Sequence, residues 1–167
     1  LVYTTDGKAP TAQSSRVPAD GKINISQDAT LQVGVLSADG QVANVVVRNY
    51  PVRPFVEHTA TINVRNENNW STLNFHVWNN KGNNNMNGSW PGKLITDTKQ
   101  VKGQTWHYQT FDITSKDYFV NVVFSTDNGA PQSVDITEIT GDRYFVITTE
   151  QRGGKYVVRD DTKLITG

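Results

Sequence analysis

Cysteine is absent from the 167 residues of the chain. That absence excludes disulfide bonds, a cysteine-ligated metal and a cysteine nucleophile. An excess of charge of one sign is also missing, because 16 Lys and Arg balance 16 Asp and Glu. Proteins that bind nucleic acid usually carry a basic excess that neutralises phosphates. The balance therefore argues against nucleic acid and favours an uncharged partner.

Long hydrophobic runs are missing as well. No stretch reaches the roughly 18–20 apolar residues of a membrane-spanning helix, so we expect no membrane insertion. The chain starts at Leu1 without the basic and apolar segments of a secretory signal. We expect it to be a fragment of a longer protein.

Helical periodicity is nearly absent. Short runs rich in Val, Ile, Thr, Tyr and Phe alternate with Gly, Asn, Asp and Pro, which is the pattern of a β-sandwich or barrel. The sequence predicts an all-β protein made of two small, immunoglobulin-like β-sandwich domains in tandem. Strands are predicted at residues 1–5, 22–25, 30–36, 44–48, 60–66, 72–78, 105–112, 118–125, 133–137, 144–149 and 155–160.

Two prolines within Tyr50–Pro54 indicate a domain boundary, because proline stiffens a connection and interrupts strand pairing. We predict a first domain at residues 1–52 and a second at 53–167. All four Trp lie in the second.

Residues 3–11, 23–25 and 39–46 of the first domain carry a recognisable series. It runs Tyr-Thr-Thr-Asp-Gly-Lys-Ala-Pro-Thr, then Ile-Asn-Ile, then Asp-Gly-Gln-Val-Ala-Asn-Val-Val. The series resembles the chitobiase C-terminal type of small β-sandwich, with its front part missing. The resemblance implies a truncated spacer or accessory domain attached to secreted glycoside hydrolases, with no chemistry of its own.

Segment 73–78 alternates with a period of two, and successive side chains of a strand point to opposite faces. Its aliphatic and phenyl side chains fill one face, which we expect to cover the core. An outward-facing Trp beside an outward-facing His needs a reason, since burying a Trp is favourable by a few kcal/mol. The inner set is Leu73, Phe75 and Val77, and the outer set is Asn74, His76 and Trp78.

A long polar loop follows this strand and ends at Trp90-Pro91-Gly92. Ten asparagines lie between Asn66 and Asn87. Neutral amides suit hydroxyl partners, and an aromatic face suits the flat C–H face of a pyranose ring. Two aromatics set at an angle, Trp78 and Trp90, fit a curved α-1,4-glucan better than a flat cellulose ribbon.

Plain structural interpretations remain open for these residues. A Trp on a strand is more often part of a core than of a site. Trp78 could cap the sheet under the loop, Trp90 could anchor the loop, and His76 could be an ordinary surface histidine. We expect Trp70 to pack against the end of the sheet. Interior positions are expected for Trp106, Tyr108, Phe111, Tyr118, Val122 and Phe124.

The order of short sequences over residues 60–140 adds a second resemblance. Asn69-Trp70-Ser71, then 74–79 (Asn-Phe-His-Val-Trp-Asn), then 88–94 (Gly-Ser-Trp-Pro-Gly-Lys-Leu), is similar to the starch-binding carbohydrate-binding module family 26. That family implies a β-sandwich that is attached to amylases and binds α-glucans without a metal.

The resemblance also implies site residues. His76, and with it Trp78, corresponds to the family's strand aromatics, and Trp90 corresponds to its loop tryptophan. The family often has Tyr at the position of His76, and sometimes at that of Asn74, which implies a narrower aromatic surface here. The expected carbohydrate-binding residues are His76, Trp78, Trp90, Lys93, Asn128 and Gln132.

Signals for catalysis are weak. The Asp residues lie mostly at turns and strand ends, and no phosphate loop, G-x-S-x-G or H-E-x-x-H is present. The three histidines lack metal-ligand spacing, so we expect no metal and no cofactor. Three functions stay open: a sugar-binding module, a pair of adhesin or protein-interaction domains, and an enzyme.

The sugar-binding function accounts for most of these features. We expect the non-catalytic region of a bacterial amylase that is secreted or attached to the cell surface. Its partners would be starch or maltooligosaccharides and the catalytic domain of the parent chain. We expect a monomer that tethers substrate near the active site.

Overall fold

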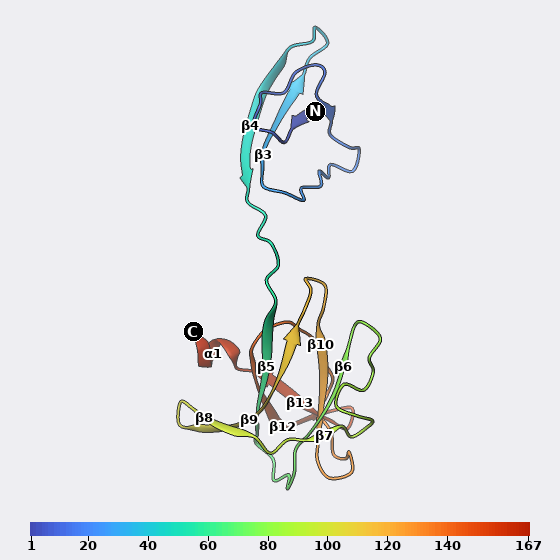
Figure 1. Cartoon of the computed structure of the whole chain (residues 1–167), viewed down its shortest axis with the longest axis vertical. Helices are drawn as coiled ribbons and strands as arrows, with labels where there is room; N and C mark the ends of the chain where they lie inside the picture. Colours follow the sequence, from blue (N-terminus) through green and yellow to red (C-terminus); the bar gives the residue numbers. More distant parts are fainter. The chain divides into compact units, whose positions relative to one another are not determined.

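The computed structural model describes all 167 residues and divides into two compact units, Leu1–Pro54 and Phe55–Gly167 (Figure 1). Both units are built from β-strands, which confirms the predicted all-β fold class. The chain's one helix, α1 (Thr162–Thr166), has five residues. No helix has the length and apolar character needed to cross a membrane.

The first unit contains a single antiparallel sheet in the order β2-β1-β3-β4. Its strands are β1 (Val2–Thr4), β2 (Ser15–Arg16), β3 (Ala29–Leu36) and β4 (Val42–Tyr50). The predicted strand at residues 22–25 is wrong. Gly21 ends a turn in which its N–H donates to the carbonyl of Pro18 at 2.9 Å, and the residues after it pair with no strand.

The second unit consists of two facing sheets. One has four strands in the order β11-β10-β6-β7, and the other has five in the order β13-β12-β5-β9-β8. The four-stranded sheet comprises β6 (Asn74–Asn79), β7 (Lys93–Leu94), β10 (Val120–Ser125) and β11 (Ile136–Ile139). The five-stranded sheet comprises β5 (His58–Asn66), β8 (Thr98–Val101), β9 (Gln104–Ile113), β12 (Arg143–Arg152) and β13 (Lys155–Asp160).

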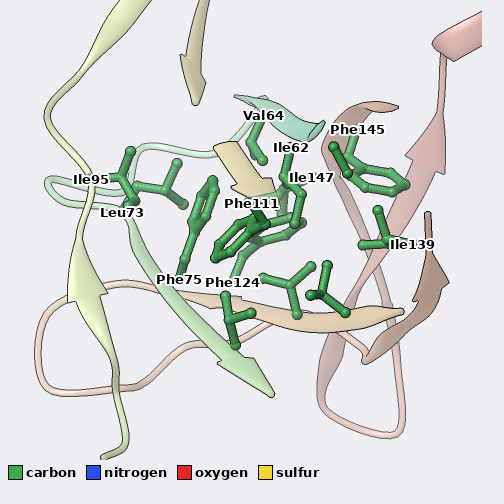
Figure 2. Packing of buried hydrophobic residues seen from close by; sticks show 14 of the residues in the cluster. Ile62, Val64, Leu73, Phe75, Ile95, Phe111, Phe124, Ile139, Phe145 and Ile147 are labelled. Carbon is green, nitrogen blue, oxygen red and sulfur yellow. The ribbon is translucent and has the colours of Figure 1, made fainter. Parts of the chain in front are cut away.

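The core of the second unit is formed by the inward-facing side chains of both sheets. Figure 2 shows Phe75 and Phe124 of the four-stranded sheet beside Phe111 of the five-stranded sheet. The rings of Phe75 and Phe124 lie 5.0 Å apart, centroid to centroid. Alternation along β6 places Phe75 and Val77 in this core, as the sequence predicts.

The strand β9 shows where the sequence interpretation was wrong. Phe111 and Ile113 face the core, so alternation turns Trp106 and Tyr108 to the outer face of the five-stranded sheet. Trp106 is buried there against the edge of Tyr144, with ring centroids 5.0 Å apart. Tyr108 is half-buried beneath the ammonium group of Lys99. Hydrophobicity alone did not separate a second, outer cluster from the sandwich interior.

Three short edge strands, β2, β7 and β8, were not predicted, because each has only two to four residues and no apolar run. Near β11 the prediction began three residues early. Ser133 precedes the observed strand but is already hydrogen-bonded to β10, because its N–H donates to the carbonyl of Phe124 at 2.7 Å. Trp70 packs edge-on against Tyr156 with centroids 5.4 Å apart, which agrees with the expected packing at the sheet end.

Candidate functional site

The outer face of β6 carries the histidine and the tryptophan that the sequence singled out. β6 pairs antiparallel with β10, with His76 opposite Val123 and Trp78 opposite Asn121. Phe75 and Val77 point inward and are fully buried, so His76 and Trp78 point to the other side and are half-buried. Because opposed residues of paired strands lie on the same face, Val123 shares the outer face with His76. Its side chain is only 5% exposed.

Three aromatic rings form a continuous row on this face. The ring centroid of His76 lies 5.8 Å from that of Trp78, with the planes 31° apart. On its other side, His76 lies 5.5 Å from Trp90, with the planes 64° apart. The imidazole therefore lies between the two indoles, and Trp90 is 41% exposed. We call these three residues the aromatic row.

A tight turn brings Trp90 to the row. The N–H of Gly92 donates to the carbonyl of Ser89 at 2.8 Å and closes a turn with Trp90 at its centre. Gly92 has a φ of +87°, and a Cβ there would lie 2.1 Å from the carbonyl oxygen of Phe75. Only glycine permits so close an approach to the backbone of β6. The turn is therefore held directly against the strand that carries His76.

The indole of Trp90 rests on a second glycine. Gly129 has a φ of +108°, and a Cβ at that position would lie 2.1 Å from Nε1 of Trp90. The residue is buried, so the indole covers it. Because Gly129 has no side chain, the indole of Trp90 can pack directly against its backbone.

The turn that contains Gly129 is fixed to the start of β6. Nδ2 of Asn74 donates to the carbonyl of Asp127 at 2.9 Å. Oγ1 of Thr72 accepts from the N–H of Asp127 at 2.8 Å, and Oγ of Ser71 donates to its carboxylate at 2.9 Å. Asn74 lies on the outer face of β6 but is only 5% exposed. Its role in this structure is to position the turn beneath Trp90.

Most asparagines of the loop between β6 and the Trp90 turn hold the loop itself. Asn87 and Gln109 exchange two amide hydrogen bonds of 2.8 Å, and Asn87 also donates to the carbonyl of Phe75 at 3.1 Å. Oδ1 of Asn80 accepts from the N–H of Phe119 at 2.9 Å. Oδ1 of Asn79 accepts from two backbone N–H groups of the loop. These amides were expected to bind the hydroxyl groups of a partner, but in the structure many of them make hydrogen bonds within the protein.

The three expected hydroxyl-binding residues are placed differently from one another. Asn128 is exposed in the turn beside Gly129, next to the aromatic row. Gln132 is half-buried and pairs with Ser125, which is itself opposite Asn74, so it shares the outer face. Lys93 lies opposite Phe75, which puts it on the inner side at the free edge of β7. The turn at Gly129 brings Asn128 to the face of the aromatic row, and strand pairing brings Gln132 there but places Lys93 on the other side.

Three positions of this site were not predicted to be part of it: Asn74 as an anchor, Gly129 as a support and Leu94. Leu94 lies opposite Asn74 on the outer face and is 50% exposed. The contact between Gly129 and Trp90 joins residues that are far apart in sequence. No local signal could have found that contact.

The two histidines outside the row have shifted pKa values. The ring nitrogens of His58 are hydrogen-bonded to the carbonyl of Val56 at 2.9 Å and to the carbonyl of Thr140 at 2.7 Å. The bond with Val56, and to a smaller extent that with Thr140, raises the pKa of the ring. Burial lowers the pKa of His107. The Lys81 ammonium, together with the hydroxyl of Ser115, lowers the pKa of the Asp117 carboxyl. No group of three or more His, Asp or Glu side chains is placed to hold a metal ion.

Comparison with known proteins gives a match to a family model. No curated protein and no solved structure gives a significant match. Residues 62–138 match the family model of starch-binding module 26. The matched segment contains β6, the Asn-rich loop, the Trp90 turn and the turn at Gly129. Modules of this family bind and do not catalyse. The second unit of this chain thus contains a match to starch-binding module 26, which indicates binding of carbohydrate.

Proposed function

We propose that the second unit binds α-1,4-glucan chains on the aromatic row. The observation that carries the proposal is the continuity of His76, Trp78 and Trp90 on one outer face, with centroid spacings of 5.8 and 5.5 Å. A flat sugar face stacks on each ring, and the angle between the rings follows the curvature of an α-glucan. Asn128 and Gln132, on the same face, supply hydrogen bonds to hydroxyl groups.

The rigidity of the row supports this function. Trp90 is held between the backbone of β6, through Gly92, and the turn at Gly129. An aromatic that is already in place loses little conformational entropy when a ligand binds. Because the surface is shallow and solvated, we expect a dissociation constant on the order of micromolar to millimolar.

The wider context is part of the same proposal. Tethering a catalytic domain to insoluble starch raises the local concentration of substrate without new chemistry. The module would belong to an amylase that a bacterium secretes or holds at its surface, and the first unit would act as a spacer. The resemblance of the first unit to a chitobiase C-terminal domain supports that arrangement.

Retention on insoluble starch tests the proposal. Trp90→Ala should lower retention by at least about tenfold, since burying an aromatic side chain contributes roughly 1.5–3 kcal/mol and each 1.4 kcal/mol is a factor of ten. Tyr50→Ala is the matched control, because Tyr50 is an aromatic of similar exposure, 43%, in the first unit. Equal retention of both variants and the unchanged protein would contradict the proposal.

A second candidate function applies to the first unit alone. The edge strand β4 exposes Val45, Val46 and Val47, by 39%, 51% and 46%. An exposed apolar strand at a sheet edge is a common site of protein contact. Sedimentation of the chain over a range of concentrations tests this: self-association that Val46→Lys removes would support a protein-contact role, and a monomer at all concentrations would support the spacer.

A further inference from the structure

A cavity of about 510 Å³ opens at one end of the sandwich in the second unit. Sites for small molecules have volumes of roughly 300–1,000 Å³. Leu73 and Ile95 both line the cavity, and they lie beside each other at one side of the core (Figure 2). Those two residues are joined by the hydrogen bond from the N–H of Ile95 to the carbonyl of Leu73, at 2.8 Å. This part of the lining is therefore a fixed part of the fold.

Seven of the twelve residues that line the cavity are uncharged and polar, while apolar atoms supply the larger share of its surface. Asn66 and Asn68 form part of the wall and are held by a side-chain hydrogen bond of 3.0 Å between them. Thr96 and Thr105 contribute hydroxyl groups, and Trp70 contributes an aromatic ring. No carboxylate lines the cavity. Arg65 is the one cationic residue of the lining, and Glu67 lies 3.5 Å from its guanidinium.

His107 also lines the cavity from β9. Burial lowers the pKa of its imidazole, which favours the neutral form of the ring. An uncharged imidazole presents one donor and one acceptor. Together with the amides and hydroxyl groups, it gives the cavity the hydrogen-bonding character that a ligand with many neutral hydroxyl groups requires.

The cavity adjoins the face of the aromatic row. Leu94 lines the cavity and lies on the outer face, opposite Asn74. Asn74 precedes His76 by two residues along β6. Two residues along a strand and one strand across correspond to about 8 Å. Ser71 and Thr72, also in the lining, hold the turn that carries Asn128 through their bonds to Asp127. Leu94, Ser71 and Thr72 therefore connect the cavity with the face of the aromatic row.

We propose that this cavity is an extension subsite that receives one end of an α-glucan whose preceding glucosyl units lie on the aromatic row. The observations that carry the proposal are the cavity's size, its lining of apolar surface with neutral hydroxyl and amide groups and without carboxylates, and its position beside the row. This proposal rests on the proposed function of the row. It adds that chain length governs affinity, because only a chain long enough to leave the row reaches the cavity.

Calorimetric titration with maltotriose and maltoheptaose tests the subsite. The unchanged protein should bind maltoheptaose about tenfold more tightly than maltotriose. Thr96→Arg places a long side chain at the mouth of the cavity and removes no hydrogen bond that the fold uses. It should bring the affinity for maltoheptaose down to that for maltotriose, and leave the affinity for maltotriose within about twofold.

Thr114→Arg is the matched control, because Thr114 is also an exposed loop threonine and does not line the cavity. Its titrations should equal those of the unchanged protein. NMR signals of the His107 ring provide a measurement that needs no variant, and they should shift with maltoheptaose but not with maltotriose. The subsite is refuted if Thr96→Arg and Thr114→Arg bind maltoheptaose equally, or if the His107 signals stay fixed with maltoheptaose.

The design separates this proposal from the one on which it rests. If the aromatic row is not the binding site, Trp90→Ala will bind maltotriose as tightly as the unchanged protein does. Failure of the subsite alone appears as a row that depends on Trp90 but binds maltotriose and maltoheptaose equally well.

Discussion

The two units of the chain are both built from β-strands, yet they differ in how much they bury. In the first unit Val2 and Pro10 are the only buried apolar side chains, and all the other buried apolar side chains belong to the second. The first unit has one sheet, whereas the second has two sheets that face each other. Runs of β-branched residues are therefore enough to form a sheet, but a core requires a second layer. The aromatic row lies on the unit that has that layer.

Removing a core ring should show the largest difference between the units. Phe124→Ala deletes a fully buried ring that contacts Phe75 and Phe145. We expect a loss of about 3–5 kcal/mol in the free energy of unfolding of the second unit, which is typical of such deletions. Urea denaturation followed by Trp fluorescence measures it, because all four Trp lie in that unit. A loss below about 1 kcal/mol would contradict the packing described here.

Gly129→Ala tests whether packing holds the site in place. The added Cβ meets the indole of Trp90 and the position has a φ of +108°, so we expect a loss of about 1–3 kcal/mol in stability and at least about tenfold weaker binding of maltoheptaose. Gly154→Ala is the control: its φ is +78°, but nothing lies within 4 Å of the added Cβ. If both variants bind the sugar normally, Gly129 does not position Trp90.

Titration of His58 and His107 should have a smaller effect on stability than these substitutions. Both residues lie in the second unit, which contains all three histidines of the chain. Carbonyl oxygens raise the pKa of His58, so its stabilising contribution is complete below about 6.5, the ordinary value, and is lost as the pH rises through its raised pKa. Burial lowers the pKa of His107, so its contribution is lost as the pH falls below about 6.5. NMR of the rings should show His58 titrating above His107, and the reverse order would refute both assignments.

The smallest effect is expected in the first unit. Val46 is 51% exposed on β4, so Val46→Ala should change stability by no more than about 0.5 kcal/mol. Thermal unfolding followed by far-UV circular dichroism measures the change. A loss comparable to that of Phe124→Ala would show that the face of β4 is covered in solution and that the contrast between the units is smaller than described.

Much of the fold was predictable because it follows local patterns. The two-residue alternation of segment 73–78 correctly placed Phe75 and Val77 in the core and turned His76 and Trp78 outward. The strand at Lys155–Asp160 was predicted with its observed bounds. Local patterns failed where tertiary contacts decide. Trp106 is buried, but against Tyr144 on the outer face of its sheet, which its apolar neighbours in sequence did not reveal.

The site was predictable in its aromatic members and in two of the three expected hydroxyl-binding residues, Asn128 and Gln132. Sequence spacing and the family resemblance identified His76, Trp78 and Trp90 as candidates, and the structure brings their rings together. The register between β6 and β7 places Lys93 on the other side, and that register depends on a strand of two residues. Asn74 and Gly129 support the site through contacts between distant segments. Composition and spacing carry no information on such contacts.

The central claim is that the aromatic row recognises the α-linked form of a glucose polymer. Parallel calorimetric titrations of the whole chain with maltoheptaose and cellohexaose test it most directly, because the two sugars differ in linkage. The account predicts saturable binding of maltoheptaose, with a dissociation constant on the order of micromolar to millimolar, and binding of cellohexaose that is at least about tenfold weaker. Equal responses to both sugars, or no response to maltoheptaose, would contradict it.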